Sequence, residues 1–374
     1  MQKKIIALAI AAALTAPAMA FAEVTVYGKA NLSIDNVNDG AVAPTASTTA
    51  KQLTSNNSRL GFKGSEDLGG GLSAIWQMEG TVAMDAGTTG TSLFDRNTWL
   101  GLKSADMGSV MLGRNDTAYK SATRRLDVFG DQIANDNRKS LGVSMMGTQG
   151  GAGFAHDARL ANMVNYVSPK LGGLTLSAST VFGAETSPQP AAPNNAKGRL
   201  MSLAGAYEDG PIYAAMAYQS VKVGNTLTGD LGVGGASVAA TAAAGDKGDA
   251  FKLGGSYKMD AITLGLVYET VSYKVKSTSA ESKGSNLYLA GKFSVSNTDA
   301  VKASYLARGT TKTTGSTTAA QNKDNLNKAT AIAIGYDHAM SKNTTVYASY
   351  TKVKQEVTGG ADPTDINVGM VYSF

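Results

Sequence analysis

Apolar and polar residues alternate at successive positions along most of this chain, and this period of two limits the fold more than any other feature. In the segment 24–35, one parity holds only apolar residues and glycine, namely Val24, Val26, Gly28, Ala30, Leu32 and Ile34. A similar split recurs in the segments 262–269 and 301–308. Successive side chains of a β-strand point to opposite faces, so each such strand has one apolar and one polar face. We therefore expect an all-β protein.

The first 22 residues have the organisation of a secretory signal. Lys3–Lys4 form a basic start, Ile5–Leu14 form an apolar stretch too short to span a bilayer, and Ala20-Phe21-Ala22 is an Ala-x-Ala cleavage site. We expect residues 1–22 to be removed, with cleavage after Ala20 as the alternative, and residues 23–374 to form one domain. No run of 18 apolar residues follows, so a membrane location would require strands.

The composition excludes several classes of function. Removing Lys3 and Lys4 from the 34 basic residues leaves 32 against 29 acidic ones, a mature net charge of +3. This balance argues against binding to nucleic acid or anchoring by a polybasic segment. The chain has no cysteine and only two histidines, which lie far apart in the sequence. We therefore expect no metal site and no cofactor.

Short, turn-rich connections alternate with long polar stretches. Seven short connections have an alternating segment on both sides, near Gly64–Gly71, Ser104–Gly108, Ser168–Gly173, Glu208–Pro211, Lys258–Asp260, Ser294–Asp299 and Asp337–Lys342. Seven hairpins supply 14 strands, and a first strand from Val24 and a last one at Ile366–Phe374 make 16. The long stretches are 37–57, 186–199, 224–249 and 308–328.

This asymmetry predicts the membrane class. Short periplasmic turns and long external loops are the organisation of bacterial outer-membrane barrels, which have an even number of antiparallel strands. Alternation by itself is also compatible with a secreted soluble β-sandwich, such as an adhesin or a lectin. The loop asymmetry favours a transmembrane antiparallel β-barrel of 16 strands.

The last strand supports the same interpretation. Its apolar residues all share one parity with the chain end, in the order Ile366, Val368, Met370, Tyr372 and Phe374. The other parity carries Asn367, Gly369, Val371 and Ser373. A terminal strand with an apolar face that stops on an aromatic residue is typical of a barrel that faces lipid.

The chain resembles the general diffusion porins of Gram-negative bacteria, the trimeric porins typified by those of Neisseria and Burkholderia. The matching segments are Val26-Tyr27-Gly28-Lys29, 58–69 (SRLGFKGSEDLG), Leu112-Gly113-Arg114, 336–342 (YDHAMSK) and the terminal Phe374. The resemblance implies an outer-membrane pore for passive diffusion of small hydrophilic solutes, with lipopolysaccharide as its neighbour. It also implies a homotrimer, a third loop folded into the lumen, and recognition of Phe374 and Tyr372 by the barrel-assembly machinery. A solute-specific porin with a saturable site is the alternative with the same fold.

Four basic residues are candidates for the pore constriction. Lys29 and Arg59 have the parity opposite to the apolar residues of their strands, so they should face the lumen. The resemblance adds Arg96 and Arg159. Strict alternation places Arg96 on the parity of the apolar Leu100, so it reaches the lumen only through a bulge or from a position above the membrane, because a charge facing lipid costs about 2–4 kcal/mol.

The segment from Arg114 to Arg159 lacks clean alternation and is the expected third loop. Asp127 and Asp131 are its best candidates for acids that face the basic wall across the lumen. Opposed charges of this kind create a transverse field at the constriction, and the expected selectivity is a mild anion preference.

An enzymatic barrel is the remaining rival. It needs an activated nucleophile, but the two histidines are His156 in the expected third loop and His338 in an expected periplasmic turn. Neither is next to a serine on a strand, so we expect no enzymatic activity.

Overall fold

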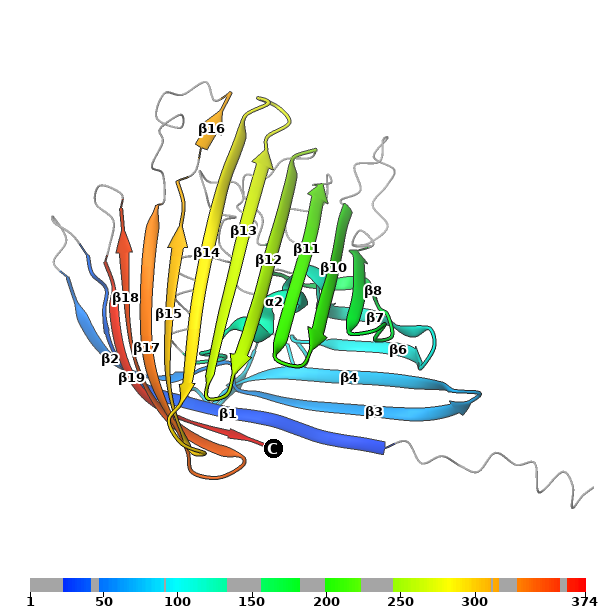
Figure 1. The fold of residues 1–374 in the computed structure, drawn as a ribbon, viewed down its shortest axis with the longest axis horizontal. Helices are drawn as coiled ribbons and strands as arrows, with labels where there is room; N and C mark the ends of the chain where they lie inside the picture. Colours follow the sequence, from blue (N-terminus) through cyan, green and yellow to red (C-terminus); the bar gives the residue numbers. More distant parts are fainter. Residues whose placement is uncertain are drawn as a thin grey trace, which may run out of the picture.

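The computed structural model describes residues 23–41, 47–90, 92–132, 156–181, 199–222, 245–310, 312–315, 328–356 and 362–374. One antiparallel sheet closes on itself into a barrel (Figure 1). Its strands are β1 (Glu23–Asn38), β2 (Thr49–Ser55), β3 (Arg59–Gly69), β4 (Leu72–Ala83), β5 (Thr88–Thr89), β6 (Thr98–Ser104), β7 (Gly108–Asp116), β8 (Arg159–Val167), β9 (Leu174–Val181), β10 (Arg199–Asp209), β11 (Ile212–Lys222), β12 (Lys247–Met259), β13 (Ile262–Lys274), β14 (Glu281–Ser294), β15 (Asp299–Arg308), β16 (Lys312–Thr314), β17 (Ala329–Ala339), β18 (Thr344–Gln355) and β19 (Thr364–Ser373).

These 19 segments form 16 barrel strands. The segments β2 and β3 pair with successive parts of β1, so together they make one barrel strand with a break between them. The short β5 pairs with β4, and the short β16 pairs with β14, and both lie within loops. Nineteen minus three leaves 16, which confirms the predicted number. All seven predicted short turns are also present.

The first and last strands close the barrel. Pairing of β1 with β19 runs from Lys29 opposite Ser373 to Asn38 opposite Thr364. The Gly28 amide donates to the Phe374 carbonyl at 2.9 Å, and the Phe374 amide donates to the Gly28 carbonyl at 3.2 Å. A closed sheet leaves no edge strand whose backbone groups would face lipid unpaired.

Two long stretches contain strands that the sequence did not predict. The expected loop 37–57 includes β2, and the expected loop 308–328 includes β16. These predictions were wrong because both segments are polar on both parities, TAKQLTS in β2 and KTT in β16. Backbone pairing beyond the apolar belt needs no apolar face, so no period of two marks such strands. The long stretches 186–199 and 224–249 lie largely outside the described residues.

Apolar side chains cover the outside of the barrel. Leu100 is 63% exposed and Ile34 is 66% exposed, whereas Asn31 and Asp35 on the opposite face of β1 are buried. A soluble sandwich would bury the first pair and expose the second. The structure therefore contradicts the soluble adhesin or lectin alternative and fits a barrel that faces lipid.

The third loop enters the barrel, as predicted. It follows β7 and carries α2 (Ala118–Thr123), capped by the Thr117 side chain, and the short 3-10 helix η1 (Arg124–Leu126). The helix α2 packs against β9–β12 from the inside, and η1 packs against β12 and β13. Figure 1 shows α2 behind the strands β10–β13. Among the described residues, no helix is long and apolar enough to cross a bilayer.

Candidate functional site: the charged lumen wall

Lys29 and Arg59 are cross-strand partners on β1 and β3, and both side chains converge on one acid of the third loop. Lys29 Nζ lies 2.7 Å from Asp131 Oδ2, and Arg59 Nη1 lies 2.8 Å from the same oxygen. Asn57 has a positive φ of 53° in the break between β2 and β3, and its carbonyl accepts from Arg59 Nη1 at 3.1 Å. The loop therefore touches this part of the wall directly, where the sequence predicted acids facing it across the lumen.

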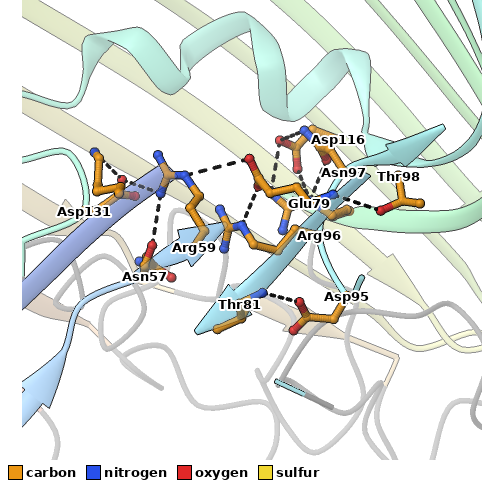
Figure 2. Close-up of polar contacts among 12 residues, drawn as sticks. Asn57, Arg59, Glu79, Thr81, Asp95, Arg96, Asn97, Thr98, Asp116 and Asp131 are labelled. Carbon is orange, nitrogen blue, oxygen red and sulfur yellow. Dashed lines mark hydrogen bonds and ion pairs between the residues drawn. The ribbon is translucent and has the colours of Figure 1, made fainter. Parts of the chain in front are cut away.

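Arg96 joins the same row of charges through Glu79 on β4. Its Nε lies 2.5 Å from Glu79 Oε1, and its backbone amide donates to the Glu79 carbonyl. The other carboxylate oxygen of Glu79 lies 3.8 Å from Arg59 Nε and accepts from the Tyr27 hydroxyl. Figure 2 shows Arg59 between Asp131 and Glu79, with Arg96 beside Glu79.

The parity conflict at Arg96 disappears in the structure. Arg96 lies in a bend, and β6 begins only at Thr98, so the alternation of β6 does not extend back to it. No bulge within the strand is needed. The buried Arg96 side chain points to Glu79 on the inner face.

Arg159, the first residue of β8, belongs to a second group centred on Asp116 at the end of β7. Its Nε lies 3.1 Å from Asp116 Oδ1 and donates to Asn97 Oδ1 at 2.6 Å. The same carboxylate binds Lys120 at 3.0 Å and Arg124 at 3.4 Å. The β7–β8 pairing shifts register between Gly113 and Asn115, an irregularity of the kind that re-aims side chains near functional sites.

Asp127 lies on the other side of the barrel. Its Oδ1 accepts from the Tyr288 hydroxyl on β14 at 3.3 Å and from the Phe129 amide. The structure therefore brings Asp131, and not Asp127, to Lys29 and Arg59, two of the four basic candidates. The other two acids of this site are Glu79 and Asp116, which were not among the predicted site residues. Glu79 has the parity opposite to Met78 of β4, so strand alternation could have found it.

The charges of this site leave a positive surplus. We call it the basic wall: six basic residues, Lys29, Arg59, Arg96, Lys120, Arg124 and Arg159, and three acids, Glu79, Asp116 and Asp131, which gives six minus three, or +3. Burial would raise the pKa of Asp131, but the charges and hydrogen bonds of Arg59 and Lys29 outweigh it and hold that pKa well below its ordinary value. Asp131 therefore stays ionised at neutral pH, and its charge is already included in the surplus.

Two lysines of the opposite wall bind the third loop. Lys252 Nζ lies 4.0 Å from the Tyr119 ring centroid and 2.8 Å from Asp157, and the Tyr119 hydroxyl donates to Glu269 at 2.5 Å. Lys302 has the same relation to a second aromatic residue, with Nζ 4.8 Å from the Phe129 ring centroid.

Lys302 has two polar partners as well. Its Nζ lies 2.9 Å from Asp337 Oδ1 and donates to Gln132 Oε1 at 2.8 Å. Both Lys252 and Lys302 are almost fully buried. Although they point inward, they hold the loop and do not offer their charge to the lumen.

Two glycines of this wall leave space for side chains of the third loop. A Cβ at Gly335 on β17 would lie 2.7 Å from Phe129 Cε1, and one at Gly254 on β12 would lie 2.6 Å from Leu126 Cδ1. Only a residue without a side chain leaves room for these two contacts. Residues of the wall strands therefore help to fix the position of the third loop.

Comparisons with known proteins agree with this architecture. A family model described as Gram-negative porin matches residues 7–358. Outer membrane porin protein 32 of Delftia acidovorans is 26% identical over 395 residues, covering 100% of both chains. The anion-selective porin from Comamonas acidovorans superposes with a TM-score of 0.70 at 23% identity, over 94% of this chain and 100% of that chain. The trimer form of OmpT, an outer membrane protein of Vibrio cholerae, has a TM-score of 0.62 at 17% identity, over 94% and 99%.

The family match covers nearly the whole chain, and the structure has the closed 16-stranded barrel with a loop inside its lumen. The chain therefore belongs to the Gram-negative porin family and is a diffusion channel of the outer membrane.

Proposed function

We propose that this channel passes small hydrophilic solutes and ions with a mild anion preference, and that its constriction lies where the third loop meets Lys29, Arg59, Arg96 and Arg159. The observation that carries the proposal is the surplus of +3 on the basic wall. Charges that line a narrow, partly desolvated passage act on ions more strongly than charges on an open surface. The name of the Comamonas relative, an anion-selective porin, supports the sign.

Distance decides which charges matter for selectivity. Interactions between solvent-exposed charges are screened over about 10 Å at 0.1 M salt. Charges of the outer loops are therefore weak compared with those at the narrowest point. Among the basic residues of the wall, Arg124 has the most exposed side chain, at 44%, so it is the best placed to meet a passing anion.

The wild-type channel tests the sign directly. In a planar bilayer with a gradient of low KCl concentrations, we expect a zero-current potential of the sign that chloride preference produces, shrinking as salt is raised. A potential of the opposite sign would contradict the proposal.

We further propose that the protein has no enzymatic activity. His156 is buried, and this burial lowers its pKa to about 4, which makes it a weak base for activating a hydroxyl near neutral pH. His338 Nδ1 lies 2.8 Å from Asp299 Oδ1 at the short-turn end of the barrel, away from the lumen site. The relatives described above are porins, which are channels.

The channel is proposed to assemble as a homotrimer. This proposal is supported by the solved trimer form of a porin with the same fold. Three independent pores that insert together should give conductance steps in groups of three in planar bilayers, with three equal sublevels on closure. Reproducible insertion of single, ungrouped steps would exclude the trimer.

Three further parts of the proposal concern biogenesis and surroundings. Residues 1–22, which lie outside the described residues, are proposed to be a secretory signal. Phe374 and Tyr372 are proposed to be read by the barrel-assembly machinery, and lipopolysaccharide is proposed to surround the outer half of the barrel. The ring centroids of Tyr372 and Phe374 are 5.9 Å apart, so the two aromatics form one exposed patch at the chain end.

A substitution at Gly335, which leaves space for Phe129, tests whether the position of the third loop controls the width of the pore. Gly335→Val should push Phe129 away from the wall and move the loop toward the lumen axis, because overpacking a fitted contact costs about 1–3 kcal/mol. We expect a lower single-channel conductance. Gly205→Val is the matched control, because a Cβ at Gly205 has no neighbour closer than 3.6 Å. Equal conductance of the two variants would show that this contact does not position the loop.

A further inference from the structure

A row of basic residues crosses four neighbouring strands on the outside of the barrel. Arg199 on β10 lies opposite Lys222 on β11, Lys222 opposite Lys247 on β12, and Lys247 opposite Lys274 on β13. All four side chains are exposed, and all four have the parity of the outward apolar residues of their strands. They lie at the strand ends away from the short turns; Figure 1 shows these strands side by side. We call them the outer basic row.

The outer basic row is electrostatically unfavourable by itself. Like charges directly opposite each other on neighbouring strands destabilise a sheet. None of the four side chains forms an ion pair or a side-chain hydrogen bond with any residue of the described part of the chain. Three consecutive repulsive pairs at one end of the barrel therefore have no counter-charge within the described part of the chain.

The neighbouring charges do not cancel the row. Glu281 lies opposite Lys274, but its carboxylate binds Lys283 at 3.1 Å. Asp249 accepts from the Tyr218 hydroxyl at 2.7 Å. With Lys283 and Lys312 next to the row, six basic residues stand against two acids, a local balance of +4.

The height of the row on the barrel identifies its surroundings. Four residues closer to the barrel middle, Tyr218 and Phe251 lie opposite each other on the outer face. Aromatic residues mark the membrane–water interface of outer-membrane barrels. Four residues of strand span about 13 Å, so the row lies beyond the hydrocarbon, at the level of lipid headgroups.

We propose that the outer basic row binds the phosphate groups of an anionic glycolipid in the outer leaflet. Neighbouring strands are about 4.8 Å apart, so four strands place their charges over about 14 Å, wide enough for two separate phosphates. A phosphate monoester carries about −1.5 to −2 charges, so two of them offset a balance of +4. This inference rests on the proposed outer-membrane orientation, with the short turns in the periplasm.

The test compares two glycolipids and two matched variants. The probes are diphosphorylated lipid A and its fully dephosphorylated form, added to the full-length channel in detergent, with the bound lipid measured by native mass spectrometry. The first variant combines Arg199→Gln, Lys222→Gln, Lys247→Gln and Lys274→Gln. The control removes four exposed lysines near the short turns, combining Lys103→Gln, Lys170→Gln, Lys258→Gln and Lys342→Gln.

Each cation near an anionic lipid surface adds to the attraction, so the wild type and the control should bind diphosphorylated lipid A at least about tenfold more tightly than the row variant does. Excess inorganic phosphate should not displace it. Equal binding by the row variant, or equal binding of the dephosphorylated lipid by the wild type, would overturn the proposal.

Planar-bilayer conductance separates this outcome from a failure of the channel. Both variants should conduct with wild-type size and zero-current potential, because their changes lie at the two ends of the barrel, away from the basic wall. If the row variant conducts normally but still binds the phosphorylated lipid, then the lipid site is wrong while the proposed channel function stands.

Discussion

The channel that carries Lys29→Glu together with Arg59→Glu is expected to prefer cations. Each replacement changes the charge by −2, so the basic wall goes from +3 to −1. The variant also places two new carboxylates against Asp131, which lies 2.7 Å from Lys29 and 2.8 Å from Arg59 in the wild type. Repulsion among three carboxylates should release this end of the third loop and widen the pore. The zero-current potential should therefore change sign, and conductance should persist or rise.

The control variant for this experiment changes the net charge by the same amount, but at residues outside the lumen. Lys283→Glu with Lys312→Glu also alters the chain by −4, but both lysines are exposed partners on β14 and β16, outside the lumen. We expect this control to keep the zero-current potential of the wild type in the same low-salt gradient. If the Lys29 and Arg59 variant also keeps it, these residues do not line the constriction.

Deleting Phe374 is expected to reduce assembled, heat-modifiable barrel in the outer membrane to a small fraction of the wild-type level. The deletion removes two backbone hydrogen bonds to Gly28 and the ring that stacks on Tyr372. Each hydrogen bond contributes only about 0.5–1.5 kcal/mol to stability. That is too little to dismantle a closed barrel, so a severe loss in cells has to arise during assembly.

A comparison of folding in cells and in vitro separates these causes. The purified deletion variant should refold in detergent to nearly the wild-type yield, whereas its level in the outer membrane should fall sharply. Phe374→Tyr keeps an aromatic ring at the chain end and should retain assembly. Poor refolding of the deletion variant in detergent would show that Phe374 acts through the stability of the β1–β19 closure, and wild-type levels in the membrane would refute the prediction.

Local sequence patterns were sufficient to predict the barrel fold. The direction of a strand side chain depends only on its parity, so alternation found the outward face of β19 and the inward position of Lys29 and Arg59. Turn residues and short spacing located all seven hairpin turns, because a tight turn depends on its own few residues. The number of strands followed from those turns.

The predictions failed or stayed open where no local pattern exists. The polar β2 carries no apolar period, and its pairing with β1 is visible only in the structure. Arg96 has a parity that conflicts with its position because it precedes β6. The resemblance supplied Arg96 and Arg159, but it did not supply their partners Glu79 and Asp116.

The tertiary structure alone decided which charges meet. The contact of Lys29 with Asp131 joins residues 102 positions apart, and that of Tyr119 with Glu269 joins residues 150 positions apart. The sequence favoured Asp127 and Asp131 equally, yet the path of the loop brings Asp131 to the basic wall and Asp127 to Tyr288. That path depends on buried lysines and on the hollow at Gly335, all contributed by distant strands. Side-chain parity is fixed within a single strand, whereas the position of a loop in the lumen depends on contacts that exist only after the barrel has closed.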